Sequence, residues 1–558
     1  MDTNNLAKVG PKEVIRGMRA VCSSSQPRVS ETMLEVMSQG GNAVDAAIAG
    51  CLIQAVIEPH MTNHAGTVSF LYWDAKSKKA YQLNGTGTFV PGLAPFRPVP
   101  PIGIRFASKE LSPAACIPGF IPALGEMHQR FGSKTWSELC TPAIYAAENG
   151  HPVTSFEYGT LTEELSFYTY FPSGRELFTP TGFLPEVGEI FRNPALAKTL
   201  NNLSKEGPSY FTEGLWAKNF IKIANLMGWP ITLQDMVRIP PRWQEPIHYS
   251  HGPDEIYQYS PPERTGVFTA IVLGIMSNYD LKTMGHYSES AETLYLLAHA
   301  LRRAHLDVGQ LYDPEVFDVP IGTWLSPQYH SMLADIIWHS RPRKDLSEHI
   351  HLTVGSPVLA AAGVPLGDMG QAHSPGGSCE LSIVDQDGNW VQMMNTLQSG
   401  GIPGMVVDGV PMVGSHARTN LQADIAGWFA GGGRIKSIAG STIVTQAGQP
   451  WLALGSPGNV YGTIPQVLGS ILDYQMDPYQ AVCLPRLDPL RDDYVIEIES
   501  RLSSEVVLDL ARMGIQVRPL PMFDYNIGSF QMSWCEPQSN VMSSSADPRR
   551  AGTSTGYS

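Results

Sequence analysis

Residues 376–394 read GGSCELSIVDQDGNWVQMM, a glycine pair followed by two apolar stretches that flank a polar turn. Residues 378–383 and 390–394 have the composition of strands, and residues 385–389 supply the turn between them. The preceding residues 354–377, VGSPVLAAAGVPLGDMGQAHSPGG, are small and poor in secondary-structure signal, as is typical of a linker. The sequence therefore predicts a flexible linker that runs directly into a β-hairpin, with Ser378 at the junction.

Helices and strands are expected to alternate through the rest of the chain. Apolar residues at helical spacing on both sides of Gly40-Gly41-Asn42 predict two packed helices within residues 32–54. Further helices are predicted within residues 118–153, 291–308, 460–471 and 505–513, and strands at 68–73, 80–83, 441–444, 451–454 and 494–498. This order indicates a layered protein of helices and sheets.

The composition narrows the class of protein. The chain has 558 residues, 43% of them hydrophobic and 16% charged, which is too apolar for a disordered chain. A formal net charge of -14 disfavours binding to nucleic acid, whose phosphates attract clustered Lys and Arg. Residues 1–20 carry charges and no continuous apolar run, so we expect no secretory signal, no membrane span and a cytoplasmic location.

Seven cysteines form no CxxC pair and are odd in number. Neither a disulfide framework nor a metal site is therefore predicted, and nothing in the sequence requires a cofactor. Most of these cysteines are expected to be small core residues.

Ser378 can become a nucleophile with its own base if the peptide bond from Gly377 is cut. The cut frees an α-amine beside the hydroxyl, and an α-amine has an unperturbed pKa of about 7.7 to 8.0. Such chemistry also requires donors for a developing oxyanion. The turn 455–459, which reads GSPGN and follows a predicted strand, offers the backbone N–H groups of Gly458 and Asn459.

Several longer motifs occur in a fixed order over most of the chain. They are GGNAVDAA at 40–47, EPH at 58–60, the segment 118–152, SIVD at 382–385 with DGN at 387–389, and GSPG at 455–458. In order and spacing they resemble the γ-glutamyltranspeptidase family. The resemblance implies an α+β fold, the four-layer αββα sandwich of N-terminal-nucleophile hydrolases.

Members of that family mature when one precursor is cut into a large and a small subunit. Here the resemblance implies residues 1–377, which end in the linker 354–377, and residues 378–558, together forming one catalytic domain. The implied enzyme is an amidohydrolase or acyltransferase that acts on a small-molecule amide without a cofactor, and a homo-oligomer is compatible with it.

The resemblance also assigns roles to individual residues. Ser378 falls at the nucleophile, which is usually threonine in the family, and Thr396 matches the second threonine that supports it. Gly458 and Asn459 match the oxyanion hole. Ser437 matches one of the paired serines of the substrate pocket.

The positions that hold the glutamyl group in the family differ here. Thr86 stands where the family has an arginine, so no fixed cation remains there to pair with an α-carboxylate. Gln398 replaces an asparagine, and the acidic pair that binds the amine falls near His416 and Arg418. We therefore expect an acyl group other than a standard γ-glutamyl group, with Arg418 or His416 as a candidate to hold its carboxylate.

Alternatives remain at two neighbouring residues and at the level of function. Cys379 is a rival nucleophile because a thiolate is intrinsically strong, although strand alternation points it away from the face of Ser378. Glu380 shares the face of Ser378 and is expected either to contact substrate or to form a structural hydrogen bond. The functional alternatives are an uncleaved, inactive family member with a binding or structural role, and a hydrolase of carbon–carbon bonds in a biosynthetic pathway.

Overall fold

The protein is described from a computed structural model. The described residues are 9–90, 116–163, 165–309, 311–315, 317–341, 378–397, 401–402, 404–412, 434, 439–490, 495–536 and 541–558.

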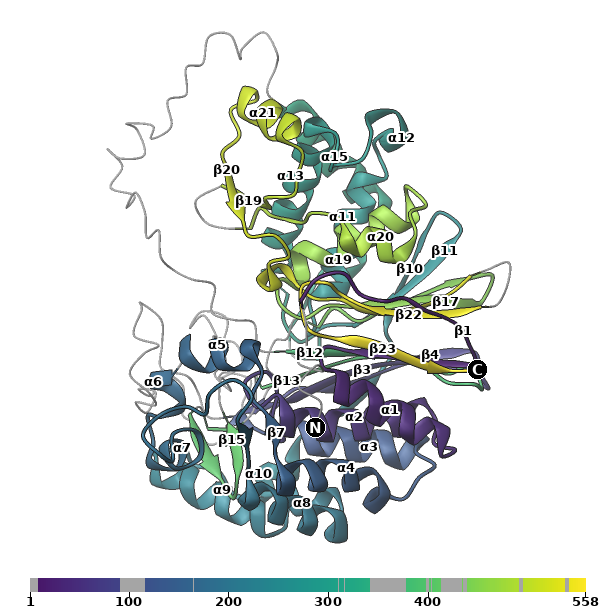
Figure 1. Cartoon of the computed structure of the whole chain (residues 1–558). Coiled ribbons are helices and arrows are strands. Elements are labelled where there is room, and N and C mark those ends of the chain that lie inside the picture. The colour runs from purple at the N-terminus through teal and green to yellow at the C-terminus, as the bar shows by residue number, and fades with distance from the viewer. Residues whose placement is uncertain are drawn as a thin grey trace.

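Two seven-stranded sheets lie face to face in the middle of the molecule (Figure 1). Every neighbouring pair in both sheets is antiparallel. In spatial order the first sheet is β23 (Thr553–Tyr557), β2 (Ala20–Ser24), β12 (Cys379–Val384), β13 (Trp390–Thr396), β3 (Thr67–Asp74), β4 (Lys79–Gly85) and β9 (Arg242–Gln244). The second is β1 (Ile15–Met18), β22 (Met542–Ala546), β21 (Gln531–Cys535), β17 (Gln449–Gly455), β16 (Thr442–Gln446), β11 (Asp254–Gln258) and β10 (Ile247–His251).

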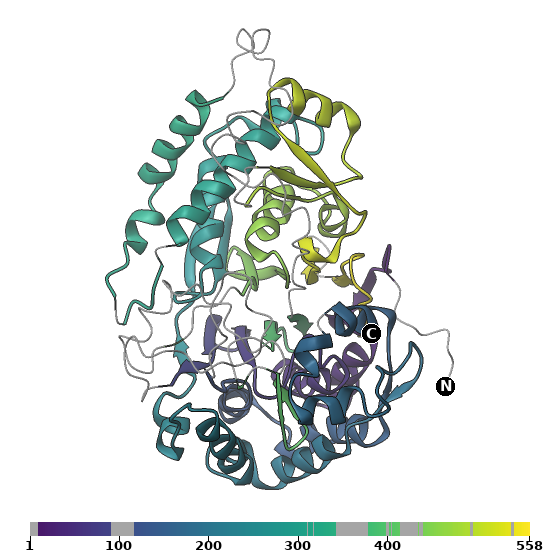
Figure 2. The ribbon, with the colours of Figure 1, turned by 90° about the vertical axis from the view of Figure 1, so that its left-hand side faces the viewer.

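Helices cover the outer face of each sheet, and the turned view in Figure 2 separates the two helical layers. The first sheet is covered by α1 (Pro27–Ser38), α2 (Ala43–Ile57) and α3 (Phe120–Phe131). Further out on the same side lie α4 (Trp136–Asn149), α8 (Pro194–Glu206) and α9 (Leu215–Leu226). The second sheet is covered by α11 (Thr265–Met276) and α19 (Val460–Leu472). Further out on that side lie α13 (Ala291–Val308), α15 (Pro327–His339) and α21 (Ser504–Arg512). The predicted four-layer αββα sandwich is thus confirmed.

Local sequence explains why α2 occupies the centre of its layer. Asn42 caps the helix by accepting from the backbone N–H groups of Val44 and Asp45, and Asp45 completes a capping box. All fifteen residues of α2 are buried, which agrees with its almost continuous apolar sequence. The predicted interruption at residues 40–42 is therefore the boundary between α1 and α2.

The predicted hairpin after residue 378 forms the middle of the first sheet. β12 pairs with β13 from Cys379↔Asn395 to Val384↔Trp390. On the outer sides of this hairpin, β12 pairs with β2 and β13 pairs with β3. Asp385 fixes the turn, because its carboxylate accepts from the backbone N–H groups of Asp387 and Asn389. The same carboxylate accepts from Ala43 N at 2.9 Å, which ties the hairpin to the start of α2.

Apolar side chains fill the space between the two sheets near the hairpin. The cluster includes Val384, Trp390 and Met394 from the first sheet, with Ile443 and Ala453 from the second. This layer is the dry inner face expected of two packed antiparallel sheets. Polar side chains also meet between the sheets, as where Ser382 donates to Ser533 Oγ at 2.9 Å.

Further helices are α5 (Ser155–Glu163), α6 (Leu165–Tyr168), α7 (Pro172–Phe178), α10 (Leu233–Arg238), α12 (Leu281–Met284), α14 (Ile321–Trp324) and α20 (Pro478–Cys483). A small sheet of β18 (Leu487–Asp488), β19 (Ile496–Glu499) and β20 (Val517–Leu520) lies beside α21 (Figure 1).

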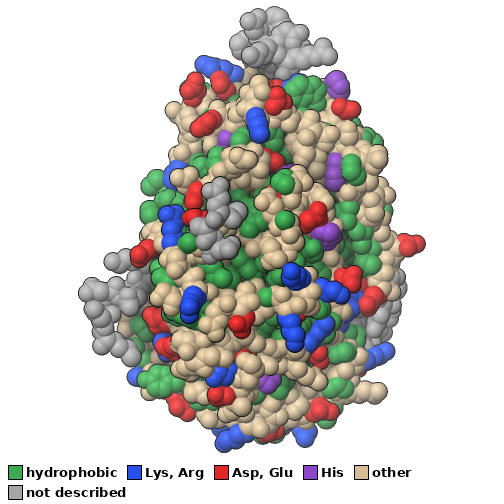
Figure 3. Space-filling view, turned by 90° about the vertical axis from the view of Figure 1, so that its right-hand side faces the viewer, with side chains coloured by type: hydrophobic (Ala, Val, Ile, Leu, Met, Phe, Trp, Pro, Cys, Tyr) green, Lys and Arg blue, Asp and Glu red, His purple; other side chains and the backbone are tan. Residues whose placement is uncertain are grey.

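The outer surface carries charges of both signs. On the face shown in Figure 3, Lys and Arg side chains stand among Asp and Glu side chains rather than forming one broad basic area. Among the described helices, none combines the length and apolar character needed to cross a membrane.

Candidate active site

Ser378 lies immediately before β12, where the chain enters the first sheet. The residue is 9% exposed, and its hydroxyl donates to Thr396 Oγ1 at 3.0 Å. The antiparallel register Cys379↔Asn395 explains this contact, because it places the next pair of residues opposite each other. Two residues that are eighteen positions apart in sequence are thereby brought together at one sheet end.

The contact between these two hydroxyl groups leads to a first prediction. Replacing Thr396 by valine keeps the side-chain shape but removes the oxygen that aims Ser378, so turnover should fall about 10²-fold. Thr396→Ser keeps the hydroxyl and should retain most of the activity. Steady-state kinetics of the two variants measures the difference, and equal rates for both would show that the hydroxyl has no aiming role.

Strand alternation separates Ser378 from its neighbour Cys379. Cys379 is fully buried on the helix side of β12, where its thiol donates to Glu58 Oε2 at 3.4 Å. Burial raises the pKa of this thiol well above its usual value, and Glu58 adds to the effect. The thiol is therefore neutral and directed into the core, which supports Ser378 over Cys379 as the nucleophile.

A buried arginine holds the backbone of Ser378 in place. Arg550 donates from one guanidinium nitrogen to the Ser378 carbonyl at 2.7 Å and from the other to Glu58 Oε1 at 2.9 Å. The second oxygen of Glu58 accepts from Ser25 and Gln54 at 3.0 and 2.8 Å. The residue that precedes β12 is thus fixed by a charge paired with Glu58 rather than by packing alone.

An aromatic side chain packs against this arginine. The ring of Phe156, on α5, lies 5.1 Å from the Arg550 guanidinium carbon, and edge-on contacts join it to His60 and Tyr525. Burial, followed by the nearby charge of Arg550, lowers the pKa of His60 well below its usual value. His60 is therefore neutral and contributes packing rather than charge.

The turn 455–459 connects β17 of the second sheet to α19. Gly458 has φ +87°, a left-handed conformation that favours glycine, and Asn459 caps α19 by accepting from Gly462 N at 3.0 Å. The positive end of the helix dipole therefore lies at the turn and favours a negative charge there. In this structure the Asn459 N–H donates to Asn526 O at 3.2 Å, so stabilising an oxyanion there would require this bond to be shared or exchanged.

A second segment, residues 526–529, packs against the turn and hydrogen-bonds to it. Ser456 Oγ accepts from Ser529 N at 2.9 Å and lies so close to Gly528 that an added Cβ there would be 2.4 Å away. Only glycine fits at Gly528, which also has φ +82°. The geometry of the turn thus depends on a segment about 70 residues further along the chain.

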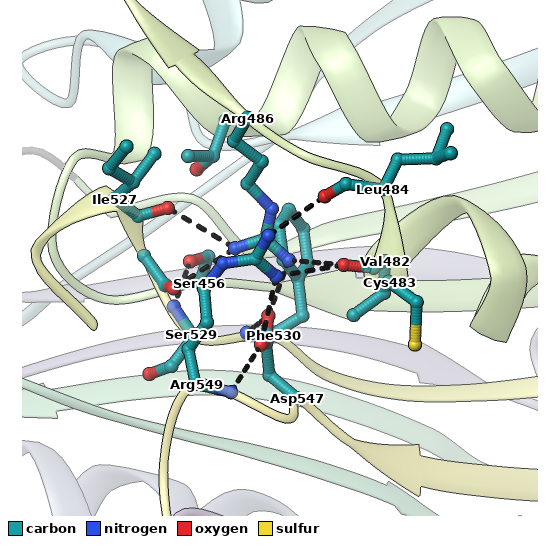
Figure 4. Close-up of polar contacts among 12 residues, drawn as sticks. Ser456, Val482, Cys483, Leu484, Arg486, Ile527, Ser529, Phe530, Asp547 and Arg549 are labelled. Carbon is teal, nitrogen blue, oxygen red and sulfur yellow. Dashed lines mark hydrogen bonds and ion pairs between the residues drawn. The ribbon is translucent and has the colours of Figure 1, made fainter. Parts of the chain in front are cut away.

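Buried charges in turn hold that supporting segment (Figure 4). Arg486 donates to the carbonyls of Ile527 and Gly528 at 3.2 and 2.9 Å and also pairs with Asp547. Arg549 pairs with Asp547 at 3.2 Å and with Glu499 at 2.6 Å. Although burial opposes it, the two arginines hold the pKa of Asp547 below its usual value, so the carboxylate stays charged.

Arg549 and Arg550 are consecutive residues that serve the two halves of the site. Arg549 belongs to the ion network behind the turn, and Arg550 holds the Ser378 carbonyl. Sequence reasoning identified neither arginine. A basic pair near the end of an acidic chain is normally surface charge, and only the 0–3% exposure of these side chains reveals their role.

Two further predicted site residues are described, and both are buried. Thr86 follows β4, donates to Asn84 Oδ1 at 2.7 Å and lines a cavity of about 440 Å³ together with α3 and α10. Glu380 lies between the sheets and accepts from Ser441 and Gln392. These bonds agree with the structural role that the sequence allowed for Glu380.

The other predicted residues lie outside the described part of the chain. They are Gly377 with the linker 354–377, and the substrate-pocket candidates Gln398, His416, Arg418 and Ser437. Within the described ranges, no group of three or more His, Cys, Asp or Glu side chains is arranged to hold a metal ion.

Comparisons with known proteins agree with this architecture. The family model for γ-glutamyltranspeptidase matches residues 29–557. The glutathione hydrolase proenzyme of Pseudomonas aeruginosa is 27% identical over 550 residues, covering 93% of this chain and 91% of that protein. The glutathione hydrolase-like YwrD proenzyme of Bacillus subtilis is 24% identical over 561 residues, covering 99% of this chain and 100% of that protein.

Among solved structures, cephalosporin acylase from Bacillus halodurans is similar with a TM-score of 0.78 and 21% identity, covering 98% of this chain and 97% of that one. This likeness shows the fold. Because the family model spans nearly the whole chain, which folds as the sandwich of N-terminal-nucleophile hydrolases, the chain belongs to the γ-glutamyltranspeptidase family of hydrolases and transpeptidases.

Proposed function

We propose that the chain cuts itself between Gly377 and Ser378 and then cleaves small-molecule amides through an ester on Ser378. The observation that carries this proposal is the Ser378 hydroxyl, held 3.0 Å from Thr396 Oγ1 at the entrance to β12. The names of the two full-length relatives describe proenzymes, which supports maturation by cleavage. Residues 1–377 and 378–558 would then be the two subunits of one catalytic domain.

Self-cleavage follows from the same hydroxyl. Ser378 Oγ attacks the carbonyl carbon of Gly377, the C–N bond breaks, and the former peptide nitrogen takes up the hydroxyl proton to become an amine. Water then hydrolyses the resulting ester and releases the carboxylate of Gly377. Arg550 favours the attack because it fixes the carbonyl of Ser378 on the opposite side of the residue.

The mature enzyme would use the released amine as its base. Ser378 Oγ attacks the amide carbon of the substrate while its proton passes to the α-amine, and the oxyanion forms near Gly458 and Asn459. The amine then protonates the leaving nitrogen as the C–N bond breaks, which leaves an acyl ester on Ser378. Water completes hydrolysis, whereas an amine in its place completes transfer.

The acyl group is proposed to differ from a γ-glutamyl group. The neutral side chain of Thr86 already donates its hydroxyl to Asn84 Oδ1, so it offers no charge to an α-carboxylate. Arg418 and His416 stay candidates to hold a carboxylate on an acyl group that lacks the α-amine.

A matched pair of anilides tests this proposal. Glutaryl anilide and γ-glutamyl anilide differ only in the α-amino group, and we expect kcat/KM to be at least about 10-fold higher for the glutaryl compound. Release of the aniline is followed by absorbance, with uncleaved Ser378→Ala protein as the blank. A preference of the same size for the γ-glutamyl compound would contradict the proposed acyl group.

A further inference from the structure

Glu380 is a fully buried carboxyl group two residues after Ser378. Its side chain leaves β12 on the same face as Ser378 and enters the space between the two sheets. There Oε1 accepts from Ser441 Oγ at 2.6 Å and from Gln392 Nε2 at 2.8 Å. Ser441 directly precedes β16, so this one oxygen joins the first sheet to the second.

The carboxyl group also lies against the backbone that opens the 455–459 turn. A Cβ added to Gly455 would be 1.9 Å from Glu380 Oε1 and 2.8 Å from Gln392 Nε2. Gly455 is the last residue of β17, and the turn with Gly458 follows it. The spacing between the Ser378 strand and this turn is therefore set by how closely Glu380 approaches Gly455.

The surroundings of Glu380 do not compensate a negative charge. Within the described residues Glu380 forms no ion pair, and neither its second oxygen nor Gln392 Oε1 has a hydrogen-bond partner. The titratable side chains that interact with Glu380 are Tyr259 and Cys51, neither of which supplies a positive charge. After the proposed cleavage, the α-amine of Ser378 would be the nearest cationic group along the strand. Burial raises the pKa of Glu380 to about 7, while the bonds from Ser441 and Gln392 lower it.

We propose that Glu380 is a positioning residue whose neutral carboxyl group holds the Ser378 strand at its working distance from the 455–459 turn. The protonated carboxyl group is favoured here because it supplies a hydrogen-bond donor among buried side chains whose acceptor oxygens lack partners. The ionised form leaves an unpaired charge between two apolar layers, which favours separation of the sheets at this point. The inference rests on the proposed nucleophile and turn, but it makes a separate prediction about stability.

The sign of the stability effect follows from the raised pKa. In the unfolded chain Glu380 ionises near its ordinary value of 4.5, whereas in the folded protein it ionises at about 7. The folded state therefore holds the proton more tightly, and the stability from this group is complete below about pH 4.5 and is lost as pH rises through about 7.

The test compares Glu380→Gln, a neutral group of the same shape, with Glu380→Ala. Below about pH 6.5, Glu380→Gln should retain kcat/KM within about 3-fold, whereas Glu380→Ala should lose at least about 10-fold, because it removes the contact with Gly455. Above about pH 7 wild-type kcat/KM should fall relative to that of Glu380→Gln, because Glu380 ionises at about 7 whereas deprotonation of the α-amine, at about 7.7 to 8.0, is common to both proteins.

Thermal unfolding supplies a readout that does not need activity. Made in the uncleaved Ser378→Ala background, Glu380→Gln should show a smaller decrease in Tm between pH 5 and 8 than its parent, whereas Glu505→Gln, at an exposed position, should follow the parent. Identical pH profiles and identical Tm changes for wild type and Glu380→Gln would overturn the inference. An inactive wild type with the expected Tm changes would instead refute the proposed function alone.

Discussion

Ser378→Ala is expected to remain a single 558-residue chain and to lose at least about 10³-fold in turnover. The substitution removes the only atom proposed to form covalent bonds in both self-cleavage and amide hydrolysis. The fold should be unaffected, because the substitution removes only a hydroxyl group at a sheet end. Gel electrophoresis reports cleavage, and anilide hydrolysis reports turnover.

Two matched variants test whether the hydroxyl of Ser378 or the neighbouring thiol is the nucleophile. Ser378→Thr keeps the hydroxyl and introduces the residue usual in the family, so both cleavage and turnover should persist. Cys379→Ala removes the neighbouring thiol, which is buried and neutral, and should also leave a cleavable chain. Efficient cleavage of Ser378→Ala together with failure of Cys379→Ala would transfer the role to the thiol.

Asp547→Ala is expected to cost about 3 to 5 kcal/mol of folding free energy. It leaves Arg486 without its carboxylate partner and removes one of the two carboxylate partners of Arg549. The cost is large because all of these side chains are fully buried. It also removes the acceptor for Phe530 N at 2.9 Å, next to the segment that supports the turn. Denaturant unfolding of the purified variant measures the loss.

An exposed ion pair provides the control for this substitution. Asp509 pairs with Arg512 on α21, where the side chains are 47% and 75% exposed, so Asp509→Ala should cause little change in stability. If Asp547→Ala were as stable as Asp509→Ala, the buried network could not be what fixes the turn.

Sequence periodicity predicted the elements whose signals are local. The predicted helix at 291–308 coincides with α13 because its apolar spacing is regular and Ser290 supplies an N-cap. The hairpin of β12 and β13 was also predicted, since an Asp-Gly-Asn turn separates two apolar strands. From the hairpin, alternation correctly placed Cys379 and Glu380 on opposite faces.

Parts of the site that depend on distant segments could not be predicted from these local signals. Arg550 reaches Glu58 across 492 residues, and Arg486 reaches Asp547 across 61. No spacing rule connects such positions, and a charged residue carries the same sequence signal whether it is buried in a network or exposed. The polar support of the turn by residues 526–529 was missed for the same reason.

Mass spectrometry of the purified wild-type protein, incubated with an acyl anilide and rapidly quenched with acid, tests the central claim most directly. We predict two polypeptides that correspond to residues 1–377 and 378–558, the smaller beginning Ser-Cys-Glu-Leu and carrying the acyl group on Ser378. A protein that remains one intact chain, without an acyl adduct on Ser378, would contradict the account.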